Sequence, residues 1–163
     1  MALYTDFGSQ KILNISNVEV LDTTLERNSQ SPVFVAVIDD EMDLAYLFKD
    51  ALSQIDGIQV FVFSDPNLAL EHFQINLQHF RLIITDHRMA GMAGIELLEK
   101  FKAINPAVTR ILMSAFEIQD EQFQERNCVD KFLQKPILMS NLINEVRMLI
   151  AIANPKEAQM LVS

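Results

Sequence analysis

The sequence predicts a doubly wound α/β domain, in which helices cover both faces of a parallel five-stranded sheet. Short apolar runs alternate with segments of helical periodicity five times between residues 33 and 153. Several of these runs are continuously apolar, which is typical of strands buried on both faces. Polar side chains directly follow the runs, and loops at the carboxyl ends of parallel strands are where such folds bind ligands.

The five expected strands are the apolar runs themselves, some of them rich in β-branched residues. The first is cut off by consecutive acids, and the third and fourth end at an aspartate and a serine. The last is short and precedes a Lys-Pro pair. In order, the expected strands comprise residues 34–38, 60–63, 82–85, 111–113 and 132–133.

The five expected helices follow from apolar residues that recur at helical spacing. Gly57 stops the first helix, Asp65 and Pro66 supply a cap residue and an early proline to the second, and Asn105-Pro106 stops the third. The fourth is an acidic stretch with a solvated face. The helices cover residues 44–55, a segment opening at 64–66, and residues 95–104, 119–126 and 142–153.

Composition and charge indicate one domain with short flanking segments. We expect an N-terminal extension or linker at residues 1–31, a domain at 32–153 and a C-terminal tail at 154–163. A net charge of −9 argues against general nucleic-acid binding, because no basic stripe neutralises phosphates. The single cysteine, Cys128, and the lack of a signal peptide or an apolar run of about 18 residues predict a cytoplasmic protein.

Five polar residues follow strand ends and are expected to converge: Asp39, Asp40, Asp86, Ser114 and Lys135. In the flavodoxin-like strand order 2-1-3-4-5, the switch point lies between the strands that carry the three aspartates. Clustered carboxylates favour Mg²⁺, with Mn²⁺ as the alternative, and the lysine and serine suit phosphoryl oxygens. Each residue alone has a plainer role, as a helix cap or turn, but capping does not explain all these strand ends together.

Four segments resemble response-regulator receiver domains, in particular the single-domain chemotaxis-type members. The segments are residues 37–41, 82–94, 111–115 and 132–136, and the resemblance covers residues 33–153. It implies a two-component phosphorelay in which Asp86 accepts a phosphoryl group from a histidine kinase or phosphotransfer protein. It also implies direct Mg²⁺ ligation by Asp40, Asp86 and the Arg88 main-chain carbonyl, with Asp39 acting largely through water.

The resemblance also implies roles for residues that bind the phosphoryl group and transmit the signal. Lys135 would bond the phosphoryl group, while Ser114 and Phe132 would move together as the switch. Output would pass to a downstream protein from a monomer or weak dimer, without direct nucleic-acid contact or membrane insertion. Because only residues 154–163 follow the last helix, we expect a stand-alone receiver that catalyses only its own phosphorylation and dephosphorylation.

Several residues depart from the family pattern or border the site. Ala90 stands where proline is common, which predicts a looser loop, and Asn127 opens a segment that replaces the usual Gly-Ala turn. Arg88 and Phe116 lie two residues after Asp86 and Ser114, where we expect them to shield the phosphate. His87 is interpreted as a loop side chain.

Other functions stay open at this point. A phosphate sink or relay, or a phosphorylation-independent binding module, would use the same residues. A Mg²⁺-dependent phosphohydrolase is less well supported, because Arg88 stands where such enzymes commonly carry a second aspartate. A nucleotide- or flavin-binding module lacks the Gly-rich loop after the first strand.

Overall fold

The computed structural model describes residues 31–115 and 127–153, which contain one parallel sheet of five strands. The strand order is β2-β1-β3-β4-β5, as predicted, and all four neighbouring pairs are parallel. The strands are β1 (Val33–Ile38), β2 (Ile58–Phe63), β3 (Phe80–Asp86), β4 (Thr109–Ser114) and β5 (Lys131–Gln134).

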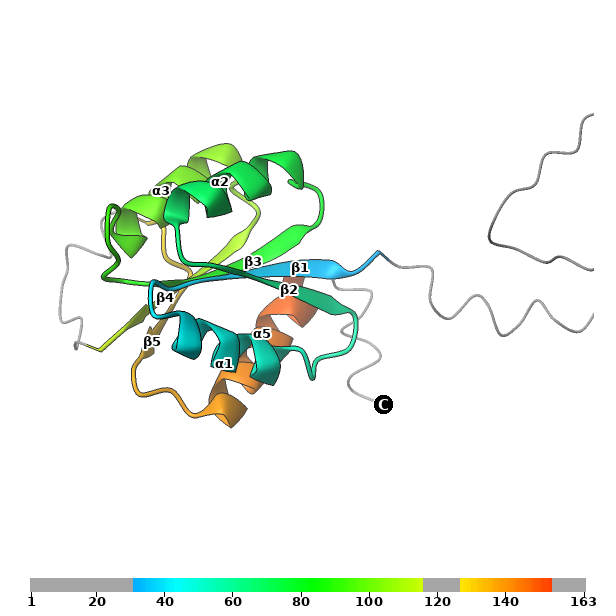
Figure 1. Cartoon of the computed structure of the whole chain (residues 1–163). Helices are drawn as coiled ribbons and strands as arrows, with labels where there is room; N and C mark the ends of the chain where they lie inside the picture. The colour runs from blue at the N-terminus through cyan, green and yellow to red at the C-terminus, as the bar shows by residue number, and fades with distance from the viewer. Residues whose placement is uncertain (1–30, 116–126, 154–163) are drawn as a thin grey trace, which may run out of the picture. The chain divides into compact units, whose positions relative to one another are not determined.

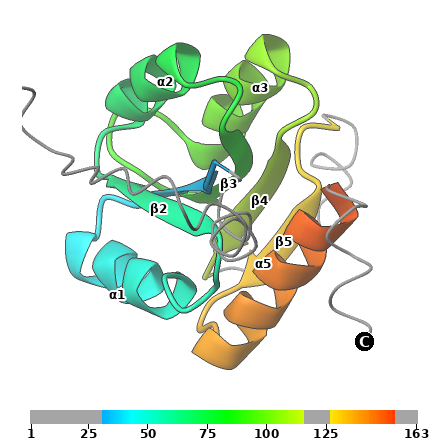
Figure 2. The same ribbon diagram turned by 90° about the vertical axis from the view of Figure 1, so that its right-hand side faces the viewer.

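Helices cover both faces of this sheet, which confirms the predicted fold class. Helices α2 and α3 lie on one face, and α1 and α5 lie on the other (Figures 1 and 2). The helices are α1 (Met42–Leu52), α2 (Pro66–Ile75), α3 (Gly94–Ile104) and α5 (Met139–Ala153). None of these described helices is long and apolar enough to cross a membrane.

Three predicted segments lie wholly or almost wholly outside the described residues. They are the helix over residues 119–126, almost all of the extension at 1–31, and the tail at 154–163. The domain boundaries at residues 31–32 and 153–154 stay predictions. The described ranges contain every other predicted strand and helix, with ends within a few residues of those expected.

The core is divided into two apolar clusters by the sheet. Alternate residues of β1 enter opposite clusters, with Ala36 and Ile38 on the α2–α3 side and Val35 and Val37 on the α1–α5 side. Side chains of a strand point to opposite faces in turn, so both faces are dry only if the run is continuously apolar. This explains why the strands read as unbroken hydrophobic runs in the sequence.

Local signals end and begin the helices as the sequence predicts. Asp65 caps α2 by accepting a hydrogen bond from the Asn67 main-chain N–H at 2.8 Å, and Pro66 occupies the first turn. Gly57 has a φ of +78°, a left-handed conformation that glycine adopts without steric cost, and the chain turns there between α1 and β2. The Asn127 backbone is also left-handed, with a φ of +47°, and its carbonyl accepts a hydrogen bond from Lys102.

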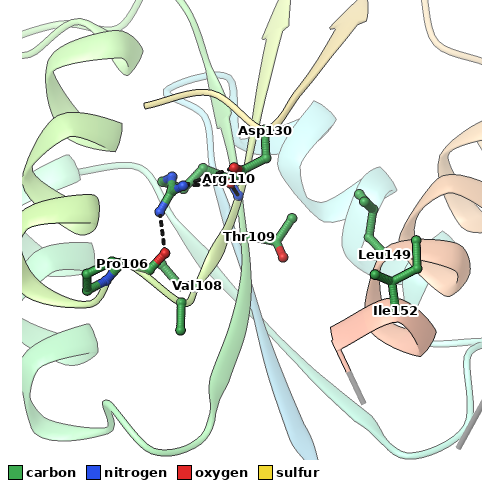
Figure 3. Close-up of a pocket in the computed structure, with 8 residues that line it drawn as sticks. Pro106, Val108, Thr109, Arg110, Asp130, Leu149 and Ile152 are labelled. Atoms are coloured by element: carbon green, nitrogen blue, oxygen red, sulfur yellow. Dashed lines mark hydrogen bonds and ion pairs between the residues drawn. The ribbon is translucent and has the colours of Figure 1, made fainter. Parts of the chain in front are cut away.

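The amino end of β4 is held by a buried arginine. Arg110 is 4% exposed, and its guanidinium donates to the carbonyl of Cys128. It also donates to the Pro106 carbonyl and pairs with the Asp130 carboxylate at 2.9 Å (Figure 3). A pocket of about 280 Å³ adjoins this cluster, and Leu149 and Ile152 of α5 face Thr109 across it (Figure 3). The pocket contains none of the predicted site residues, which lie at the opposite end of the strands.

Candidate functional site

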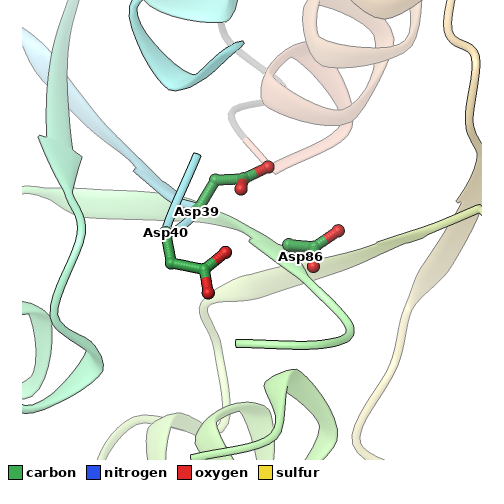
Figure 4. Close-up of side chains that lie close together, drawn as sticks. All are labelled: Asp39, Asp40 and Asp86. Atoms are coloured by element: carbon green, nitrogen blue, oxygen red, sulfur yellow. The ribbon is translucent and has the colours of Figure 1, made fainter. Parts of the chain in front are cut away.

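Three carboxylates meet at the carboxyl edge of the sheet. Asp39 and Asp40 follow β1, and Asp86 is the last residue of the adjacent β3 (Figure 4). One oxygen from each lies within 4.8 Å of the others. The prediction that the strand order brings these residues together is therefore confirmed. Asp39 is fully buried and Asp86 is 8% exposed, whereas Asp40 is open to solvent.

Lys135 supplies the positive charge that offsets two of these acids. It follows β5, and its Nζ lies 2.7 Å from Asp86 Oδ1 and 2.9 Å from Asp39 Oδ2. Burial lowers the pKa of Lys135, but hydrogen bonds to Asp86 and Asp39 outweigh burial, so the pKa is raised overall. The lysine is thus held as a cation between the two buried carboxylates.

Main-chain N–H groups orient all three carboxylates. Asp39 Oδ1 accepts from the Glu41 N–H at 3.0 Å, and Asp86 Oδ2 accepts from the Arg88 N–H at 2.9 Å. Asp40 Oδ2 accepts from the Ala90 N–H at 3.1 Å, although the two residues are 50 positions apart. Asp39 and Asp40 do not serve as the N-cap of α1. That position is occupied by Glu41, whose side chain makes no capping hydrogen bond.

Ser114 ends β4 beside this cluster and is 2% exposed. Its Oγ lies 3.5 Å from the Nδ1 of His87. The pKa of His87 is lowered by burial and by the positive charge of Arg88, while Asp86 acts in the opposite direction. His87 lies in the loop, as expected, and its ring is directed at Ser114.

Phe132 is half-buried in β5 and packs against the core cluster on the α2–α3 side of the sheet. It pairs in register with Leu112 of β4, two residues before Ser114. The two predicted switch residues therefore lie on adjacent strands. Phe116, expected to shield the phosphate, lies outside the described residues, whereas Arg88 is described and exposed in the loop after Asp86.

Two contributors to this site were missed by sequence reasoning, because both act through the backbone. Gly94 begins α3, and a Cβ at this position would overlap the carbonyl oxygen of Asp86. Ala90 contributes only its N–H. For Gly94, its place at the end of the motif over residues 82–94 was the one available signal. An alanine gives no signal of a main-chain hydrogen bond.

The donor set fits a hard divalent cation. All three converging side chains offer carboxylate oxygen, which is what Mg²⁺ and Ca²⁺ bind, and the exposed Asp40 leaves one side of the cluster accessible to water. Lys135 Nζ already contacts Asp39 and Asp86 as a cation would. The arrangement defines an acidic cation site with a lysine at its edge, on a doubly wound α/β fold.

Comparison with known proteins identifies the class. The sequence pattern of the response regulator receiver domain matches residues 35–147, so the chain belongs to that family. Receiver domains are phosphoacceptor modules of two-component signalling and partner histidine kinases. The three aspartates form the acidic pocket typical of the receiver Mg²⁺ site.

Curated relatives that match the chain include longer proteins. The chain is 32% identical over 110 residues to the transcriptional regulatory protein ZraR of Escherichia coli, covering 66% of this chain and 24% of that protein. It is 27% identical over 138 residues to the two-component response regulator ARR6 of Arabidopsis thaliana, covering 77% of this chain and 73% of that protein. The chain thus spans about a quarter of the ZraR relative.

Solved structures confirm the fold. The receiver domain of the Francisella response regulator 1452 is 28% identical with a TM-score of 0.62, over 72% of this chain and 95% of that one. A CheY-like receiver domain protein from Methanospirillum hungatei has a TM-score of 0.67 at 20% identity, over 77% of this chain and 99% of that one.

Proposed function

We propose that Asp86 of this receiver accepts a phosphoryl group from a histidine kinase or phosphotransfer protein, in the presence of Mg²⁺ or Mn²⁺. The observation that carries the proposal is the position of the Asp86 carboxylate. It ends β3 beside two other aspartates, and its Oδ1 contacts Lys135 Nζ at 2.7 Å. A nucleophile, a cation site and a phosphate-binding charge thus occupy one place.

In the proposed transfer, an Asp86 oxygen attacks the phosphorus of a phosphohistidine. The new P–O bond forms as the P–N bond breaks, and the histidine nitrogen keeps the bonding electron pair. The ionised carboxylate needs no general base. Lys135 would turn from Asp86 Oδ1 to a phosphoryl oxygen, and the Ser114 hydroxyl would donate to another. A bound Mg²⁺ supplies charge neutralisation for the phosphoryl oxygens.

The proposed ligand roles differ among the acids. Asp40 and Asp86 are assigned to direct ligation together with the Arg88 main-chain carbonyl, and Asp39 to ligation through water. Supporting this division, Asp39 is fully buried and already bonded by both Lys135 and the Glu41 N–H. Asp40 is exposed, so its remaining carboxylate oxygen is accessible.

We propose output by protein contact, with Ser114 and Phe132 as the coupled switch. Supporting this, α5 exposes two apolar side chains one helical turn apart: Met148 is 61% exposed and Ile152 is 73% exposed. The proposed form is a stand-alone monomer or weak dimer in the cytoplasm. The single cysteine, Cys128, is a buried free thiol, which agrees with a reducing compartment.

The test is phosphorylation by a small-molecule donor. The protein is incubated with Mg²⁺ and acetyl phosphate, and its intact mass is followed over time. We expect a gain of one phosphoryl group that requires Mg²⁺ and disappears on treatment with hydroxylamine, which cleaves acyl phosphates. The Asp86→Asn variant should show no such gain.

A matched control is Asp56→Asn, which makes the same change at an exposed aspartate in the turn before β2. This variant should be phosphorylated like the unmodified chain. Absence of any Mg²⁺-dependent gain in the unmodified chain would contradict the proposal and favour a phosphorylation-independent binding module. A gain retained in Asp86→Asn would place the acceptor elsewhere.

A further inference from the structure

The loop between β3 and α3 contacts the acids on both neighbouring strands. Its Arg88 N–H donates to Asp86 Oδ2 at 2.9 Å, within the same loop. Its Ala90 N–H donates to Asp40 Oδ2 at 3.1 Å, across to the end of β1. The second bond spans 50 positions in sequence, so it joins the loop after β3 to the loop after β1.

Asp40 differs from the other two acids in how it is held. Asp39 and Asp86 are buried, and Lys135 Nζ lies within 2.9 Å of both. Asp40 is exposed, and its described hydrogen bond comes from the Ala90 N–H. Three carboxylates within 4.8 Å of one another repel, and an exposed side chain is the one able to rotate away into water.

The bond to Ala90 opposes that rotation without using up the carboxylate. A carboxylate carries two oxygens and about four lone-pair sites. The Ala90 N–H occupies one site on Oδ2, so Oδ1 and the other lone pair of Oδ2 stay available for a cation. A main-chain amide also adds no net charge, so it does not compete with a cation as a lysine would.

We propose that the Ala90 main-chain N–H is a positioning group that holds Asp40 beside Asp86 and so raises the affinity of the site for a divalent cation. This inference rests on the proposed function, because it assumes that Asp40 is a cation ligand. The positioning bond should be worth about three- to tenfold in Kd for Mg²⁺, the range of a typical net hydrogen bond in a protein.

The variant that removes the bond is Ala90→Pro, because proline has no main-chain N–H. Its matched control is Ala90→Ser, which changes the side chain and keeps the N–H. Mg²⁺ affinity is measured by NMR titration of the whole chain, and thermal unfolding in EDTA checks that each variant folds. We expect Ala90→Pro to bind Mg²⁺ about three- to tenfold more weakly, and Ala90→Ser to bind like the unmodified chain.

Equal or tighter Mg²⁺ binding by Ala90→Pro would overturn the inference. If Ala90→Pro does not fold, amide hydrogen exchange of the unmodified chain in EDTA tests the bond itself. The Ala90 amide should be protected, and Asp40→Ala should remove this protection while leaving Gly94, which donates to the His87 carbonyl at 2.9 Å, unchanged. An unprotected Ala90 amide would also overturn it.

These outcomes separate the inference from the proposed function. Failure of the unmodified chain to bind Mg²⁺ would contradict the function, and with it the inference. Normal Mg²⁺ binding and phosphorylation by the unmodified chain, together with unaltered Mg²⁺ affinity in Ala90→Pro, would overturn the inference alone. Saturating Mg²⁺ should restore phosphorylation of Ala90→Pro, since every proposed ligand is still present.

Discussion

At the scale of single residues, Lys135 balances the charge of two buried acids. Its Nζ bridges Asp39 and Asp86, which would otherwise repel each other at the edge of the sheet. The convergence of these three residues could be predicted from sequence, because each follows a strand and parallel strands end at one edge. The roles of Ala90 and Gly94 could not, because a backbone N–H and a missing Cβ have no pattern in a single sequence.

Replacing Lys135 by alanine should separate cation binding from phosphorylation. The ammonium contacts the same carboxylates that a divalent cation would neutralise, so its removal should tighten Mg²⁺ binding by about three- to tenfold. Phosphorylation by acetyl phosphate should slow by at least about tenfold, because the proposed contact of Lys135 with a phosphoryl oxygen is lost. NMR titration and intact mass measure the two effects, and Lys49→Ala on α1 is the control. Weaker Mg²⁺ binding in Lys135→Ala would contradict the expectation that Lys135 and Mg²⁺ compete for the same carboxylates.

Lys135 should also affect how the free energy of unfolding depends on pH in the alkaline range. Its pKa in the folded chain is raised above the ordinary value of 10.5 because its bonds to Asp86 and Asp39 outweigh burial. A raised pKa contributes stability that is present below the unfolded value and is lost as pH rises through the folded value. The free energy of unfolding, measured in urea from about pH 10 upward, should therefore fall more steeply in the unmodified chain than in Lys135→Ala. Parallel curves would contradict this assignment.

At the scale of elements, the first turn of α3 packs directly on the backbone of Asp86. Gly94 allows this approach, since a Cβ there would overlap the Asp86 carbonyl oxygen. The carboxyl ends of the strands are also joined by backbone bonds. The His87 N–H donates to the Met113 carbonyl at 2.8 Å, and the Lys135 N–H donates to the Ser114 carbonyl at 2.7 Å. The site residues are thus positioned by their elements as well as by one another.

Substitution of Gly94 by alanine should therefore displace Asp86 without removing any chemical group. We expect slower phosphorylation, by about tenfold or more, together with a loss of about 1–3 kcal/mol in the free energy of unfolding. Gly57→Ala is a matched control. An alanine at the left-handed φ of Gly57 should cost about 1–2 kcal/mol of stability. The added Cβ would meet no other atom, and the turn is remote from the site. Equal phosphorylation rates in the two variants would show that α3 does not position Asp86.

At the scale of the whole molecule, a sheet buried on both faces accounts for what the sequence could predict. Continuous apolar runs indicated the strands because Val37 and Ile38 enter separate cores on opposite sides of β1. The flavodoxin-like strand order was expected because it places the switch point between the strands that carry the three aspartates. The turn before β5 was harder, because Asn127 adopts a left-handed backbone that the sequence left open. The bonds of Arg110 were equally hidden, because its partners are mostly carbonyls.

Cation binding should stabilise the whole fold, because the acids come together only in the folded chain. At a Mg²⁺ concentration ten times the Kd, the free energy of unfolding should rise by about 1.4 kcal/mol. Urea unfolding with Mg²⁺ and with EDTA measures this difference. The gain should shrink in Asp40→Ala and persist in Asp56→Asn. A gain of equal size in Asp40→Ala would mean that Mg²⁺ acts elsewhere on this acidic chain.

The buried arginine at the start of β4 holds the amino end of that strand, the end away from Ser114. At the amino end, Arg110 bonds the turn at Pro106 and the segment from Cys128 to Asp130. Ser114 stands at the other end, where its carbonyl accepts from the N–H of Lys135, the residue after β5. A rearrangement that begins at Ser114 should therefore travel sideways into β5 and not lengthwise along β4. On addition of beryllofluoride, amide exchange should change at Lys135 and stay constant at Arg110 and Asp130.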